Sequence, residues 1–305
     1  MPRSLALPRK LSAIVLTASC LLASSQLAAQ FDPDYVPPKT IDGTADLQGV
    51  WENNTITPVE RPAVFGDKQF LTDEDVVFLE QRLEEIYAAG EDALFGGGVL
   101  EAAFSGEIQS YDPSTGNYDS QWMAERTIHR RTSQIIDPPN GQFPPRTEAA
   151  IAAARELREH REAHPADSWT DRPLGERCLS FGAPRLGSGY NSYWQIVQSK
   201  NTVVIYQEMA HETTNYSEPS DTAPRTIEKR NVERITRVSD DAIQYQLTSY
   251  DPGQFTAPYT REIIFDHTDS KIYEYACHEG NYGMENILRG HRAEERMARE
   301  AGATP

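Results

Sequence analysis

The pattern of apolar and polar positions divides the chain into a helical N-terminal half and a strand-rich C-terminal half. A capping box at Thr72 is followed by apolar residues at helical spacing, which predicts an amphipathic helix that continues to about Ala89. Thr147 caps an alanine-rich charged segment, and the helix predicted there must end before Pro165. A segment with charged residues on nearly all sides, Met284–Arg299, predicts a last helix.

Short segments rich in Val, Ile, Tyr and Thr, separated by turn residues, make up most of the second half. In one of them Ile243, Tyr245 and Leu247 alternate with polar residues, as expected of a strand with one buried face. Several strands at this spacing predict an antiparallel sheet that curls into a barrel or half-barrel. Strands are predicted at Asp46–Trp51 and Thr132–Ile136 and, in the second half, at Ser192–Gln198, Thr202–Met209, Ile227–Val238, Ala242–Tyr250, Tyr259–Asp266 and Lys271–Cys277.

The first thirty residues have the pattern of a secretory signal peptide. Arg3, Arg9 and Lys10 precede an uncharged run from Leu11 to Ala23, and small residues follow up to a cleavage site after Ala29. The run is shorter than the roughly 20 residues that cross a bilayer, and no later segment is longer and as apolar. We therefore expect a periplasmic or secreted protein without an integral membrane segment.

The predicted fold class is α+β. We expect a curved antiparallel sheet, or a lipocalin-like β-barrel that is complete or incomplete, together with a helical and irregular N-terminal half. The predicted organisation is a signal peptide at 1–29, a proline-rich tether at 30–40 and a single domain at 41–305, divided into a helical or irregular part (41–170), an antiparallel β part (171–282) and a C-terminal helix (283–305).

Composition excludes several classes of partner and enzyme. The whole chain carries a net charge of -17, and removal of the three basic signal residues makes the mature form more negative still. Such a surface repels nucleic acid and anionic lipid, so neither is expected as a partner. The sequence contains no nucleophile-elbow serine, phosphate loop or dinucleotide fingerprint, and no motif indicates a cofactor.

Cleavage of the signal peptide removes Cys20 and leaves two cysteines, Cys178 and Cys277. In an oxidising compartment an even pair predicts a disulfide, which would close a loop of about a hundred residues and contribute roughly 4 to 5 kcal/mol. The alternative is a reactive thiolate or a metal ligand at Cys277, since His278 and Glu279 follow it. No Cys-x-x-Cys pair supports a structural metal site, and the metal content is left open.

Candidate catalytic residues lie at the ends of two predicted strands. Glu208 and His211 end one strand, and His278 and Glu279 follow another. Histidine and glutamate at a barrel mouth could support acid–base or metal chemistry. Ordinary ion pairing at the ends of a sheet gives the same composition, so both interpretations stay open.

Aromatic residues in the predicted strands are candidate ligand-binding residues. An aromatic side chain with a polar tip suits a pocket for an amphipathic or aromatic molecule. The alternative is an ordinary sheet core. The candidates are Trp194, Tyr206, Tyr245 and Tyr275.

The remaining histidines are expected to have structural or solvated roles. His129 precedes two arginines and marks a basic spot that either holds an anion or pairs with neighbouring carboxylates. His267 is expected in a turn. Solvated positions on charged helices are expected for His160, His164 and His291.

Four phrases resemble a family of exported, uncharacterised bacterial proteins whose C-terminal part is β-rich and lipocalin-like. They are RTSQIIDPPNGQFPP from Arg131, DRPLGERCL from Asp171, YNSYWQIVQ from Tyr190 and YEYACHEGNYGMENIL from Tyr273. The resemblance implies no activity. It does imply a deletion, because members of that family carry a segment long enough for two or more strands between the counterparts of Gln207–His211 and Thr213–Tyr216, which abut here. Loss of those strands would leave an exposed sheet edge.

Three functions are consistent with these features. The first is an exported soluble protein that binds a small amphipathic or aromatic molecule in a barrel-like pocket. The second is a periplasmic hydrolase, lyase or isomerase that uses histidine and glutamate at the barrel mouth. The third is an interaction module that forms a homodimer through an exposed edge near Thr202–His211 or Thr226–Val238. The sequence leaves the ligand, the oligomeric state and the choice among the three open.

Overall fold

The computed structural model describes residues 31–88, 100, 103–104, 126–172, 176–178, 186, 191–208, 228–277 and 282–302. The predicted signal peptide lies outside these residues. Among the helices within them, none combines the length and the apolar character that a membrane span requires.

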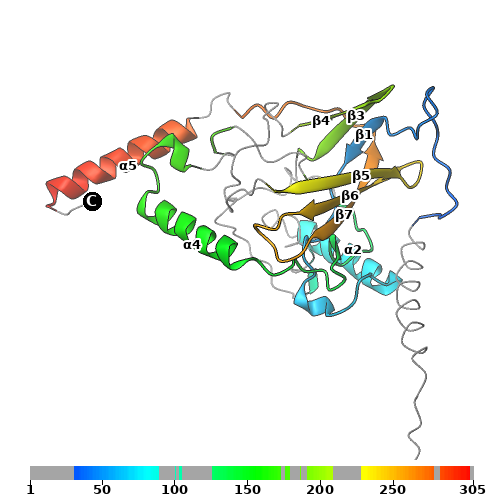
Figure 1. Cartoon of the computed structure of the whole chain (residues 1–305), viewed down its shortest axis with the longest axis horizontal. Helices are drawn as coiled ribbons and strands as arrows, with labels where there is room; N and C mark the ends of the chain where they lie inside the picture. The colour runs from blue at the N-terminus through cyan, green and yellow to red at the C-terminus, as the bar shows by residue number, and fades with distance from the viewer. Residues whose placement is uncertain are drawn as a thin grey trace, which may run out of the picture.

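The described strands form one antiparallel sheet that curls into a half-barrel (Figure 1). The order of the strands is β4-β3-β1-β7-β6-β5, and β2 pairs with β7 beside this path. The prediction of an α+β fold with a curved antiparallel sheet is therefore confirmed. The strands are β1 (Gly49–Glu52), β2 (Ile135–Asp137), β3 (Tyr193–Ser199), β4 (Thr202–Gln207), β5 (Arg230–Arg237), β6 (Ala242–Tyr250) and β7 (Tyr259–Thr268).

Strand β1 comes from the N-terminal half of the chain but lies in the middle of the sheet. Trp51 is opposite Trp194 of β3 on one side and His267 of β7 on the other. Gly49 has a φ of +139°, and a Cβ atom there would stand 3.3 Å from the His267 ring. Both the backbone conformation and the close approach therefore favour glycine at this position.

One face of the sheet carries a fully buried aromatic core. The Trp194 ring centroid lies 4.3 Å from that of Phe265 and 5.4 Å from that of Tyr245. Trp51 is also fully buried, and its indole N–H donates a hydrogen bond to the Leu47 carbonyl oxygen. The strict alternation of β6 sends its large apolar residues to this face.

A second core lies beyond the opposite face and is built on helix α2 (Asp73–Ala88). Leu79 and Leu83 of α2 are buried there together with Ile56. The predicted capping box is present: the Asp75 N–H donates to Thr72 Oγ1, and the Thr72 N–H donates to the Asp75 carboxylate.

Two charged helices lie at the end of the molecule away from the sheet (Figure 1). Helix α4 (Glu148–Ala163) begins after Thr147, whose hydroxyl accepts a hydrogen bond from the Ala150 N–H at 3.1 Å. Helix α5 is Gly283–Glu300 and has no buried residues. Two short 3-10 helices, η1 (Ala63–Phe65) and η3 (Trp169–Asp171), complete the described elements.

One predicted strand is absent from the sheet. Residues 271–277 form no strand and pair with none of the strands that the structure describes. The Tyr273 N–H donates its hydrogen bond to the carboxylate of Glu208 and not to a neighbouring strand. The prediction of a strand at Lys271–Cys277 was wrong for this reason.

Candidate functional site

The sheet ends at β4 on one side and at β5 on the other, and within the described ranges each of these strands pairs on one side only. Strand β4 carries no charged side chain. Val203, Val204 and Tyr206 of β4 are 50%, 53% and 50% exposed, and Val197, opposite Val204 on β3, is 48% exposed. We refer to these four side chains as the β4 surface; Val203 lies on the face of Trp194, and the other three lie on the opposite face. The β4 surface is an uncharged, β-branched edge of the kind that pairs with another strand.

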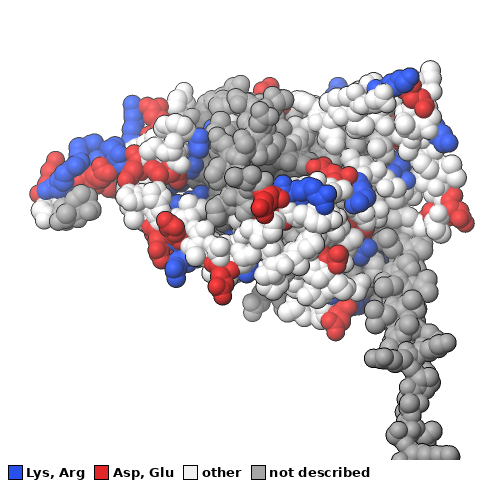
Figure 2. Space-filling view, in the orientation of Figure 1, with Lys and Arg blue, Asp and Glu red and all other residues white. Residues whose placement is uncertain are grey.

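The edge at β5, in contrast, is charged. Basic and acidic side chains stand next to one another over this strand (Figure 2). The Arg230 guanidinium lies over the Tyr250 ring at 4.2 Å, and Arg237 donates to the Asp46 carbonyl oxygen at 2.9 Å. Charged residues on an edge disfavour the approach of another strand, because that approach would desolvate them. They are Arg230, Glu233, Arg234 and Arg237.

Glu208 directly follows β4 and is 5% exposed. One carboxylate oxygen accepts a hydrogen bond from the Tyr273 N–H at 2.9 Å, and the other accepts one from the Asn191 side-chain amide at 3.3 Å. Burial raises the pKa of Glu208, and the hydrogen bonds from Tyr273, Asn191 and the Tyr193 backbone only partly oppose this. The carboxyl group joins three segments, and its raised pKa lets it keep a proton to a higher pH than an exposed glutamate does.

Tyr193 stands beside this carboxyl group at the start of β3. It is opposite Glu52 of β1, and burial followed by the negative charge of Glu52 raises the pKa of its hydroxyl, with a smaller contribution from Glu208. Glu52, Tyr193 and Glu208 lie close together only because of the pairing register of β1, β3 and β4. Sequence analysis did not assign Tyr193 to the site because nothing in the local pattern indicates this register.

Of the four predicted catalytic residues, only Glu208 lies within the described part of the chain. His211, His278 and Glu279 fall outside the described residues, and their convergence stays a prediction. The Tyr273 hydrogen bond nevertheless places the segment that leads to His278 at the end of β4.

The predicted disulfide is present. Cys178 and Cys277 are joined by an S–S bond, with their Cα atoms 5.5 Å apart. The bond fastens the end of the 271–277 segment to residues 176–178. The alternative of a free thiolate or metal ligand at Cys277 is therefore excluded for the oxidised protein.

The four predicted ligand-binding residues are not gathered around one cavity. Trp194 and Tyr245 are fully buried and pack in the aromatic core. Tyr206 is paired with Gln195, so its side chain lies on the face opposite to that of Trp194. Tyr275 is half-buried in the segment before Cys277.

His129 pairs with a carboxylate, as one of the two interpretations of its basic surroundings predicted. Its Nδ1 atom lies 3.0 Å from the Thr55 hydroxyl, and its Nε2 atom lies 3.2 Å from Asp266 Oδ2. Arg131 donates to the buried carboxylate of Glu262. Arg130 pairs with Asp73 of α2, so carboxylates of β7 and α2 together neutralise the basic spot.

Glu262 is the centre of a polar layer between the sheet and the N-terminal segments. Its second oxygen accepts hydrogen bonds from the side-chain amides of Gln244 and Gln246, each at 2.9 Å. A cavity of about 10 Å³ lies in this layer, which is the space of one water molecule. It is too small for an organic substrate. Its lining residues are Thr55, Thr57, His129, Arg131, Gln134, Glu262, Ile263 and Ile264.

One expectation for the other histidines was wrong. His267 lies within β7 and not in a turn, and its ring packs edge-on against Trp51 at 5.3 Å. His160 and His164 are exposed, as expected, and each lies near a carboxylate: His160 stands 3.3 Å from Asp171, and His164 stands 2.7 Å from Asp167. His291 of α5 is only partly exposed.

Comparison with protein-family models, curated proteins and solved structures found no match to this chain. Functional inference therefore starts from the geometry described above.

Proposed function

We propose that this protein is an exported interaction module whose β4 edge accepts a strand from a second copy of the chain. The observation that supports this is the contrast between the two ends of the sheet. The β4 surface is uncharged and half-exposed, whereas β5 carries four charged side chains. Pairing at β4 would satisfy outward-facing backbone groups and bury valine and tyrosine without desolvating a charge.

A second copy is the partner that β4 suits best. Antiparallel pairing of a strand with its own copy is the arrangement that a two-fold axis generates, and it needs only one kind of surface. Because β4 has no charge, self-pairing opposes no like charges across the interface. The net charge of -17 still repels two copies at long range, so association should strengthen as salt is added.

Sedimentation equilibrium of the mature chain tests this function. We expect a dimer at micromolar concentration, since the β4 surface is small compared with the roughly 800 Å² per partner of a standard interface. Val204→Lys should make the protein monomeric by placing an ammonium group on the edge. Val77→Lys is the matched control, because Val77 is 52% exposed but lies on α2. A wild-type monomer, or a Val204→Lys variant that dimerises like the control, would contradict the proposal.

The buried carboxyl group of Glu208 favours a second candidate function, ligand binding or acid–base catalysis at the end of β4. In this proposal Glu208 holds or transfers a proton, and His211 and His278 complete the site. A small amphipathic ligand would bind at the same place, with Tyr206 or Tyr275 beside it. The raised pKa of Glu208 supports the proposal, because the shift is toward the ambient pH, where a general acid or base works best.

Chromogenic p-nitrophenyl esters and glycosides, together with native mass spectrometry for co-purified ligands, test this second function. We expect Glu208→Gln and His278→Ala to abolish turnover or ligand retention while the melting temperature changes little. Glu274→Gln is the control, since Glu274 is exposed in the same segment as Tyr273. Wild-type protein with neither turnover nor ligand would contradict this candidate.

A further inference from the structure

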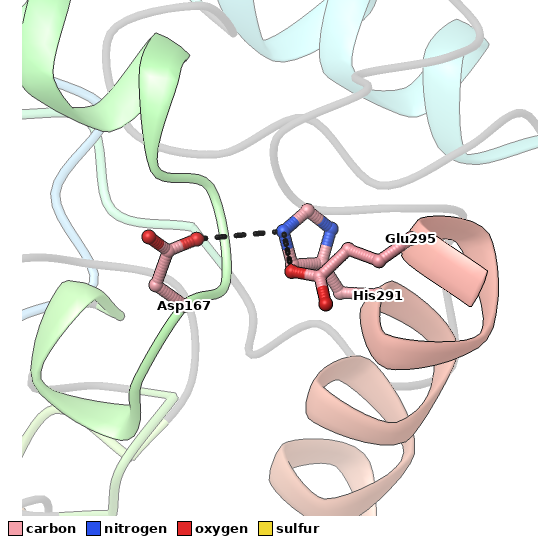
Figure 3. Close-up of side chains that lie close together, drawn as sticks. All are labelled: Asp167, His291 and Glu295. Carbon is pink, nitrogen blue, oxygen red and sulfur yellow. Dashed lines mark ion pairs between the residues drawn. The ribbon is translucent and has the colours of Figure 1, made fainter. Parts of the chain in front are cut away.

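A cluster of histidine and carboxylate side chains lies where the segment after α4 meets α5, far from β4 (Figures 1 and 3). His291 Nε2 is 3.5 Å from Asp167 Oδ1 and 3.7 Å from Glu295 Oε1. The three ligand atoms all lie within 4.8 Å of one another. His291 and Glu295 extend from α5 toward Asp167, which comes from the other segment (Figure 3).

These separations are close to those of a metal centre. Zinc binds nitrogen and oxygen ligands at about 2.0 to 2.2 Å, so neighbouring ligands of a tetrahedral site stand roughly 3.3 to 3.6 Å apart. Two of the three separations in the cluster agree with this range to within a few tenths of an ångström. His291 and Glu295 are four residues apart on α5, which places them on the same face of the helix. Only small side-chain movements are needed to bring the three ligands around one ion.

Supporting groups surround the ligands in the manner of a metal site. The second oxygen of Asp167 lies 2.7 Å from His164 Nδ1. The second ring nitrogen of His291 faces Glu294 at 3.7 Å. Hydrogen-bonded carboxylates, and histidines whose other nitrogen faces a carboxylate, are the usual outer shell of protein-bound metals.

Arg292 fixes the position of Asp167 relative to α5. Its guanidinium donates to the Ala166 and Asp167 carbonyl oxygens at 3.2 and 3.1 Å, so it holds the backbone of this segment against the helix. The same guanidinium is 2.7 Å from Glu295 Oε1. A metal ion must therefore compete with Arg292 for Glu295, which limits the affinity to a moderate value.

The charges of the cluster also suit a cation. Asp167 and Glu295 face Arg292, Glu294 faces His291, and Arg299 stands 3.7 Å from Glu295, so three carboxylates stand against two guanidinium groups.

We infer that Asp167, His291 and Glu295 form a binding site for a divalent transition-metal ion, with zinc as the best fit. One imidazole and two carboxylates match zinc better than magnesium or calcium, which prefer ligand sets made only of oxygen. The fourth position would be open to water. Such an ion would tie the segment after α4 to α5.

Calorimetric titration of the EDTA-treated mature protein with Zn²⁺ and, separately, Mg²⁺ tests this site. We expect one Zn²⁺ bound with micromolar affinity, a higher melting temperature with zinc, and no comparable effect of Mg²⁺. His291→Ala and Glu295→Gln should weaken zinc binding by at least about tenfold and remove the thermal shift. Glu285→Gln is the matched control, because this carboxylate is on the same helix but pairs with Arg289. Zinc binding that survives His291→Ala unchanged, or no binding by the wild type, would overturn the inference.

Two further variants separate this site from the proposed functions. A His211→Ala/His278→Ala double variant should bind zinc at this site as the wild type does, and a loss of binding in it alone would overturn the assignment to α5. Val204→Lys should also bind zinc normally, because β4 contributes no ligand. The inference of a zinc site and the proposal of a dimer can therefore be contradicted independently of each other.

Discussion

The two ends of the described sheet differ in charge more than in strand propensity. Strands β4 and β5 both contain β-branched residues, and both follow the alternation of the sheet. They differ in the four charged residues of β5, of which Arg230 and Arg237 are engaged with Tyr250 and the Asp46 carbonyl oxygen. An edge strand whose charges have local partners is stabilised as an edge. The β4 strand has no such residues, and this difference is the basis of the proposed pairing with another strand.

The largest expected effect comes from removing the aromatic support beneath the β4 side of the sheet. Trp194→Ala deletes a fully buried ring on β3 and should lower the free energy of unfolding by about 3 to 5 kcal/mol. Urea denaturation measures this change. Hydrogen exchange should show that β4 loses protection before β5. Tyr282→Ala, at an exposed position outside the sheet, should change stability by less than about 0.5 kcal/mol and serves as the control.

Loss of the disulfide should have the next largest effect. Replacing Cys178 and Cys277 by alanine opens a loop with a sequence separation of 99 residues and should cost about 2 to 5 kcal/mol. The bond fastens the segment that contacts Glu208, so exchange should increase at the end of β4 and remain unchanged in β5. Denaturation with and without reductant measures the stability. An equal increase in amide exchange at β4 and β5 would show that the disulfide does not stabilise the β4 end of the sheet in particular.

Adding a charge to β4 and removing charges from β5 should move the proposed dimer interface from β4 to β5. In a Val204→Lys background, Glu233→Thr and Arg234→Thr would remove two charges from the middle of β5 and should restore self-association through that strand. We expect a gain of roughly tenfold in the association constant, which corresponds to about 1.4 kcal/mol. Sedimentation velocity over a range of concentrations measures it. A variant that stays monomeric would show that charge alone does not protect β5.

The smallest expected effect is a pH dependence at the end of β4. The pKa of Glu208 in the folded protein is raised above the ordinary value of 4.5, which also applies to the unfolded chain. Between the unfolded-state pKa and the folded-state pKa, the folded protein therefore holds a proton that the unfolded chain releases. Stability from this group is therefore present at low pH and is lost as pH rises toward the folded-state pKa. Glu208→Gln should remove that slope.

Melting temperatures of the wild type and Glu208→Gln between pH 4.5 and 8 measure this slope. The wild type should gain stability relative to the variant as the pH falls. Glu274→Gln, at an exposed position, should follow the wild type. A difference between wild type and Glu208→Gln that does not vary with pH would mean that Glu208 does not titrate in this window.

The local pattern of apolar and polar residues predicted most of the helices and strands, but it did not predict which strands pair in the sheet. The limits predicted for β6 match the structure because Ile243, Tyr245 and Leu247 alternate strictly with polar residues. Nothing near Gly49–Glu52 indicates that this strand lies between β3 and β7, since that position is determined by packing between distant segments. Residues 271–277 have the composition of a strand, yet the contact between Tyr273 and Glu208 replaces a ladder hydrogen bond.

The candidate sites were predicted only in part. The sequence indicated an edge in the two segments that contain β4 and β5, and these are the strands at the ends of the described sheet. It did not show that Val203 and Val204 are half-exposed, because their exposure depends on what covers them. The His160–His164 and His291–Glu295 spacings of four residues were a metal-binding signal that sequence analysis overlooked. The approach of Asp167 to α5 could not have been predicted, because it depends on how two helical segments meet.

The central position of β1 has a consequence for the order of folding. The ribosome makes Trp51 early, but its partners Trp194 and His267 emerge much later. The middle of the sheet is therefore completed last, and the first strand must wait unpaired while most of the chain is made. Long-range pairing of this kind folds slowly and leaves apolar surface exposed to aggregation in the meantime. A nascent chain with this topology should depend on a holding chaperone until residues near 268 are available.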